Sequence, residues 1–158
     1  MAKPRDIPDL HADDAFAAAA AKVVAVRAQE LADHSRNVLD TSDIERLHDM
    51  RVATRRLRAV LEIFAPCFPK REHAEILSEV KALADALGER RDPDVHIAAL
   101  DAFATEVKPS SRAGVRLLAG RFRDEQAQAN ADLAQALQRA EESDLHGRLR
   151  ALVAGQRV

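Results

Sequence analysis

Hydrophobic positions recur every three or four residues along almost the whole chain, and this spacing predicts α-helices. No stretch of strand length alternates apolar and polar residues, and the few Gly and Pro residues are clustered. These clusters divide the chain into helices joined by short connections. We therefore predict an all-α fold, an antiparallel helical bundle of four to five helices.

Capping and breaking residues set the expected boundaries of these helices. Ser42 and Glu45 have the spacing of a capping box, and Gly88 fits the position just after a helix. Asp92 and Pro93 suit the N-cap and first position of the next helix. The predicted helices cover residues 13–39, 42–65, 71–87 and 92–107, and a long stretch from 112 that is interrupted near Ser143 or Gly147.

The second predicted helix has a clear apolar side. Placed at about 100° per residue, six residues with 3,4 spacing form a seam that is expected to face the core. A second stripe with the same spacing lies one residue further along and carries cation-capable side chains instead. The seam contains Leu47, Met50, Thr54, Leu57, Leu61 and Phe64, and the stripe contains His48, Arg51, Arg55 and Arg58.

The charge of this segment differs from that of the whole chain, which has a formal net charge of -2. Five arginines and one acid, Asp49, lie between Arg46 and Arg58. Like charges three or four residues apart repel one another on a helix, so the stripe requires an offsetting anion. That anion is either an external phosphate or the carboxylates of Glu72, Glu75 and Glu79 on the next helix, because guanidinium groups bind both. The pattern leaves both readings open.

A second charged cluster lies between the third and fourth predicted helices. Arg90 and Arg91 follow Gly88, whereas Asp92 and Asp94 suit the positive end of the next helix. Lys81 follows a core position with the same offset as the arginine stripe, so it is a candidate to face the same cavity.

These two segments resemble the CHAD domain, the conserved histidine α-helical domain. The resemblance rests on His48-Asp-Met-Arg51-Val-Ala-Thr-Arg55-Arg56-Leu-Arg58 and on Leu87-Gly-Glu-Arg90-Arg91-Asp92-Pro-Asp94-Val95, with Lys81 between them. The order and separation of the two motifs also agree, and the helical pattern extends the similarity over most of the chain.

The resemblance implies a helical bundle whose basic residues bind inorganic polyphosphate, often on intracellular granules. Family members usually contain two similar helical halves, and this chain is long enough for one, so a complete basic cavity would need two chains. By position, Asp92 and Asp94 would orient the arginines and cap the helix. The implied polyphosphate ligands are His48, Arg51, Arg55, Arg56, Arg58, Lys81, Arg90 and Arg91.

Other classes of function are disfavoured by the composition. The chain has no Trp or Tyr and only five Phe, which argues against a protein that reads nucleic-acid sequence, although nonspecific phosphate contact stays open. A helical protein-interaction module is the other alternative. His48 has no suggested catalytic partner, the only cysteine is Cys67, and no phosphate-binding Gly-rich loop occurs, so we expect no enzyme activity, metal or cofactor.

The sequence also predicts the domain organisation, location and assembly of the protein. Residues 1–10 are predicted to be a flexible tail and 11–158 a single helical domain. The chain contains neither a membrane-spanning run nor a signal peptide, so a cytoplasmic location is expected. Val52, Ala59 and Ile63 are apolar but lie away from the seam, which predicts a homodimer that covers them.

Overall fold

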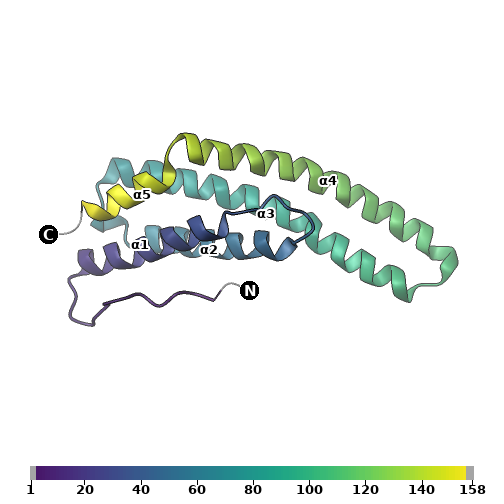
Figure 1. Cartoon of the computed structure of the whole chain (residues 1–158), viewed down its shortest axis with the longest axis horizontal. Coiled ribbons are helices and arrows are strands. Elements are labelled where there is room, and N and C mark those ends of the chain that lie inside the picture. Colours follow the sequence, from purple (N-terminus) through teal and green to yellow (C-terminus); the bar gives the residue numbers. More distant parts are fainter. Residues whose placement is uncertain (1–2, 156–158) are drawn as a thin grey trace.

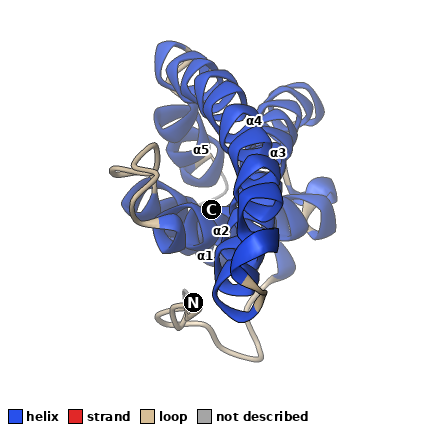
Figure 2. Cartoon of the chain, turned by 90° about the vertical axis from the view of Figure 1, so that its right-hand side faces the viewer, coloured by secondary structure: helices blue, strands red, loops and turns tan. Residues whose placement is uncertain are grey.

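The structure is a computed structural model that describes residues 3–155. Within this range the protein consists of helices and loops without a strand (Figure 2), which confirms the predicted all-α class. The helices are α1 (Phe16–His34), α2 (Ile44–Ile63), the short 3₁₀ helix η1 (Ala65–Cys67), α3 (Lys70–Glu106), α4 (Pro109–Glu142) and α5 (Leu145–Ala154).

Successive long helices run in opposite directions. Figure 1 shows α1 and α2 side by side, with α3 and α4 forming a longer hairpin that extends beyond them. The short helix α5 continues past the end of α4 and packs against α1. The bundle therefore has a packed half, to which every helix contributes, and an overhanging half made of α3 and α4 alone.

The predicted seam of α2 is the side that packs into the core. Leu47, Met50, Thr54, Leu57 and Leu61 are all buried, and Phe64 is partly buried against the same cluster. Thr54 remains satisfied because its hydroxyl donates to the carbonyl of Met50 at 2.8 Å. The 3,4 spacing thus correctly identified the buried face of this helix.

Both ends of α1 and the start of α2 differ from prediction. The first helix begins at Phe16, which is 59% exposed, and ends at His34 instead of continuing to residue 39. The expected capping box is wrong: α2 starts at Ile44, after Asp43, and no side chain caps it. The hydroxyl of Ser42 donates instead to the carboxylate of Asp40 at 2.7 Å, an alternative that short polar side chains offer near helix ends.

The predicted break between the third and fourth helices does not exist. Helix α3 continues through Gly88 and Pro93, so Gly88 does not end a helix and Asp92 does not cap one. Proline removes one backbone hydrogen bond from a helix, which costs about 3 kcal/mol. Packing of α3 along the whole length of α4, the most extensive helix contact in the protein, offsets that loss.

The remaining helix boundaries agree more closely with those predicted from the sequence. Helix α4 begins at Pro109, three residues before the predicted start, because proline is well tolerated at a first helical position. The predicted interruption near Ser143 is confirmed. Asp144 adopts a left-handed conformation there, with φ of 50°, and its carboxylate accepts a hydrogen bond from the backbone N–H of Gly147.

Part of the N-terminal segment contacts α1. Arg5 forms an ion pair with Asp33 at 2.6 Å, and its carbonyl accepts a hydrogen bond from Arg27. Residues 1 and 2 of the predicted tail lie outside the described residues, and the flexibility of the rest stays a prediction. Within residues 3–155, no helix combines the length and apolar character needed to cross a membrane.

Candidate functional site

The four cation-capable side chains of the α2 stripe lie along the edge of its buried seam. His48, Arg51 and Arg58 are half-buried and Arg55 is exposed, so all four side chains are accessible to solvent. The stripe extends about 15 Å from first to last at the rise of an α-helix. Within residues 3–155, neither Arg51 nor Arg55 forms a side-chain hydrogen bond or an ion pair.

Helix α3 brings Lys81 to one end of this stripe. The carboxylate Oε1 of Glu62 accepts from Nε of Arg58 at 3.1 Å and lies 3.2 Å from Nζ of Lys81. Hydrogen bonds from Arg58 and then from Lys81 lower the pKa of the Glu62 carboxyl below its ordinary value. Lys81 thus lies near Arg58, with a carboxylate between the two cations.

Arg91 lies further along α3, toward the other end of the stripe. Because α2 and α3 are antiparallel, the ten residues from Lys81 to Arg91 run in the direction from Arg58 back to His48, over about 15 Å at the rise of an α-helix. Arg91 is half-buried, and its Nη1 has no hydrogen-bond partner among the described residues. A β-carbon added at Gly88 would meet no atom within 4 Å, so the backbone of α3 is open there.

The acids of α3 that could have neutralised the stripe are directed elsewhere. Glu79 pairs with Arg148 of α5 and accepts a hydrogen bond from Ser143, while Glu75 pairs with Arg71 and with Arg148. Glu72 is exposed. The alternative in which these acids hold Arg51 and Arg55 is therefore not the arrangement in the structure.

Arg90, a predicted ligand, lies in the interior instead of at the surface. Its side chain is 0% exposed, and it donates to the carboxylate of Asp94 and, through Nε, to Asn130 of α4 at 3.0 Å. Gln126 also donates to Asp94 at 2.6 Å, and Asn130 donates to the carbonyl of Leu39. Asp94 therefore orients Arg90 as predicted, but within a buried cluster that joins α3, α4 and the loop after α1.

Arg56 faces a different neighbour from the other predicted ligands on α2. Burial raises the pKa of the Glu30 carboxyl of α1, but hydrogen bonds from Arg27 and from the backbone N–H of Arg5 outweigh burial. The charge of Arg56 lowers the same pKa further. Arg56 thus lies on the α1 side of the helix, away from the face that meets Lys81. Asp92, which was predicted to support the arginines, is exposed on α3.

Sequence reasoning missed Gln126 and Asn130, the two amides of the buried cluster. They are uncharged and lie one helical turn apart on α4, so no charge pattern marks them. Ala119, Leu133 and Leu137 lie at helical spacing on one face of this helix, and polar residues replace apolar ones on that face between Ala119 and Leu133. This interruption was the sequence feature that could have identified them.

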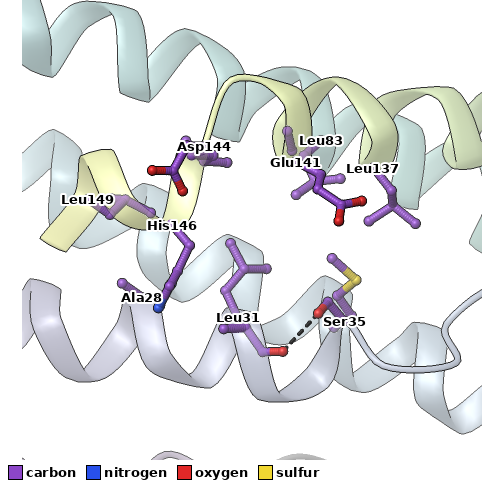
Figure 3. Close-up of a pocket in the computed structure, with 13 residues that line it drawn as sticks. Ala28, Leu31, Ser35, Leu83, Leu137, Glu141, Asp144, His146 and Leu149 are labelled. Carbon is purple, nitrogen blue, oxygen red and sulfur yellow. Dashed lines mark hydrogen bonds between the residues drawn. The ribbon is translucent and has the colours of Figure 1, made fainter.

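A cavity separate from the stripe is lined by none of these cations. It has a volume of about 420 Å³ and lies between α1 and the junction of α4 with α5. Figure 3 shows leucines lining it, together with Glu141 and Asp144. A largely apolar cavity that is lined by two carboxylates is unsuited to a polyanion, so the stripe on α2 remains the candidate site.

A family model described as CHAD domain matches residues 22–157, nearly the whole chain. The chain belongs to the CHAD domain family. Neither a curated protein nor a solved structure gave a significant match. The matched range of this CHAD domain includes α2, α3 and every predicted polyphosphate ligand. No group of three or more His, Cys, Asp or Glu residues within the described part of the domain is arranged to hold a metal ion.

Proposed function

We propose that this CHAD domain binds inorganic polyphosphate along the α2 stripe and the part of α3 beside it. The carrying observation is that Arg51 and Arg55 have no ion-pair partner within residues 3–155, while the nearby acids Glu75 and Glu79 are held by Arg148. A row of unneutralised guanidinium groups repels itself, and a bound polyanion removes that cost. The proposed ligands are His48, Arg51, Arg55, Arg58, Lys81 and Arg91.

The chemistry of the row suits a polyphosphate chain. Such a chain offers only repeated phosphate oxygens, without bases or apolar groups, so aromatic side chains are not required to recognise it. Each guanidinium group can bind phosphate oxygens in bidentate fashion, and release of counterions provides much of the binding free energy. Arg90 and Arg56, which face the interior and α1, support the fold in this proposal instead of contacting the ligand.

The proposal is one of binding without catalysis, because a row of cations is sufficient to hold a polyanion. We further propose that the protein is cytoplasmic and associates with polyphosphate granules. We also propose that it forms a homodimer, because apolar residues of α2 are accessible to solvent. Ile63 is 64% exposed, Ala59 is exposed and Val52 is half-buried.

The central test replaces Arg51 and Arg55 together with Ala. We expect the double variant to lose most of its affinity for long-chain polyphosphate, with helicity and thermal stability nearly unchanged. The slope of log affinity against log salt should become shallower by about one unit for each arginine. Arg116→Ala with Arg121→Ala is a matched control, since it removes the same charge from exposed positions of α4 and should retain both affinity and slope.

Competition with nucleic acid separates the proposal from nonspecific phosphate binding. Unlabelled polyphosphate should displace labelled nucleic acid at a much lower concentration than the reverse experiment requires. A stable Arg51, Arg55 double variant with wild-type affinity and an unchanged salt slope would rule out the proposed site.

A further inference from the structure

Glu62 is the one carboxylate that continues the stripe of cations on α2. Its Oε1 lies 3.1 Å from Nε of Arg58 and 3.2 Å from Nζ of Lys81. A single oxygen therefore contacts cations from two different helices. This is also how a non-bridging phosphate oxygen would contact the same pair, since both cations donate hydrogen bonds to anionic oxygen.

The three side chains are open to solvent in equal measure. Arg58, Glu62 and Lys81 are each 42% exposed, so water and salt screen their interaction. Exposed ion pairs contribute little to stability, and a more highly charged anion can therefore displace a carboxylate from them.

We infer that Glu62 is an internal competitor of the ligand, a carboxylate that occupies the phosphate position between Arg58 and Lys81 until polyphosphate displaces it. The inference rests on the function proposed above and adds a specificity-determining residue to that site. Arg51 and Arg55 are available without displacement, whereas a phosphate oxygen can take the position shared by Arg58 Nε and Lys81 Nζ only when Glu62 moves away.

This arrangement divides the site into one part that can bind phosphate directly and a second part from which Glu62 must first move away. A short polyphosphate that reaches only Arg51 and Arg55 gains nothing from displacing Glu62. A longer chain that extends along α2 to Arg58 and Lys81 gains two further cations in exchange for one broken carboxylate contact. Glu62 should therefore weaken binding of long chains more than of short ones.

The test compares Glu62→Gln with Glu89→Gln. Both variants remove one negative charge from an exposed residue, but Glu89 lines the hollow between α3 and α4 together with Asp85 and Asp132, away from Arg58. We expect Glu62→Gln to bind long-chain polyphosphate about two- to fivefold more tightly, the range that corresponds to an exposed ion pair. Glu89→Gln should change the affinity much less.

A second comparison separates local competition from a general effect of charge. In a background of Arg58→Ala with Lys81→Ala, Glu62 has no cation left to occupy, so Glu62→Gln should have no larger effect than Glu89→Gln. Titrations with a short and a long polyphosphate should also show that the gain in the intact background is larger for the long chain. Circular dichroism and thermal unfolding confirm that each variant is folded.

The outcomes distinguish this inference from the function on which it rests. Wild-type protein that fails to bind polyphosphate, or that binds independently of Arg51 and Arg55, overturns the proposed function. Wild-type protein that binds through Arg51 and Arg55, with equal effects of Glu62→Gln and Glu89→Gln, overturns only the role of Glu62.

Discussion

Arg90 and Asp94, one helical turn apart on α3, form an ion pair in which both side chains are inaccessible to solvent. Two amides of α4 contact the pair, since Gln126 donates to Asp94 and Asn130 accepts from Arg90. Asn130 also donates to the carbonyl of Leu39 at 3.1 Å. The cluster therefore fixes how the α3–α4 hairpin meets the loop that leads into α2.

Breaking this pair should destabilise the protein strongly. Arg90→Leu leaves the Asp94 carboxylate buried without its cation, which typically costs about 3–5 kcal/mol. Chemical denaturation monitored by circular dichroism measures that loss directly. Arg91→Leu, at the half-buried neighbouring position, should cost much less, and an equal loss in the two variants would contradict the structural role of Arg90.

Glu30 should make part of the stability depend on pH. Its side chain is 2% exposed, and hydrogen bonds from Arg27 and from the backbone of Arg5 outweigh burial, so the pKa of its carboxyl lies below the ordinary 4.5. A lowered pKa gives stability that is fully present above about pH 4.5 and is lost as the pH falls through the folded-state pKa. Glu30→Gln should therefore lose stability at neutral pH and lose less than the wild type on acidification.

Denaturation at pH 7 and at several acidic pH values measures both effects of Glu30→Gln. We expect a loss of about 1–3 kcal/mol at pH 7, because the hydrogen bonds to Arg27 and Arg5 lose a charged acceptor. Glu89→Gln provides the exposed control. A constant difference between wild type and Glu30→Gln at every pH would contradict the lowered pKa.

Two glycines should respond to alanine in opposite directions. A β-carbon at Gly147 would collide with the carboxylate of Asp144, which caps α5, so Gly147→Ala should cost about 1 kcal/mol through loss of the cap. Gly88 lies within α3 with open space around it, so Gly88→Ala should raise stability by up to about 1 kcal/mol through helix propensity. Thermal unfolding of the two variants tests both signs.

The proposed homodimer predicts an effect of charge on the exposed side of α2. Ile63→Asp should convert the dimer to a monomer at tens of micromolar, as measured by light scattering, with little effect on helicity because Ile63 is exposed. Leu118→Asp places the same charge on the overhanging part of α4 and should leave the dimer intact. If only Leu118→Asp dissociates the dimer, the contact is formed by the α3–α4 hairpin instead. A wild-type monomer at these concentrations would contradict the dimer itself.

The sequence allowed the helical class and the buried face of α2 to be predicted because both depend on local periodicity. Residues with 3,4 spacing share a face of a helix whatever the helix packs against, and Leu47 to Leu61 follow that rule. The row from His48 to Arg58 follows by the same reasoning. The turn near Ser143 was also predictable, since Ser143 and Gly147 are weak helix formers.

The sequence alone did not determine which partner each charge meets. The break predicted at Gly88 and Pro93 is absent because contact with α4 outweighs the local cost of proline, an energy that belongs to two helices together. Arg90 and Arg91 are neighbours in the sequence, yet the 100° between successive residues places one in the core and leaves the other half-buried. Glu75 and Glu79 could have neutralised the α2 stripe, but the fold brings Arg148 from α5 to them. Periodicity thus determined the faces of the helices, whereas the pairing of charges was decided by the tertiary structure, because it depends on contacts between residues distant in the chain.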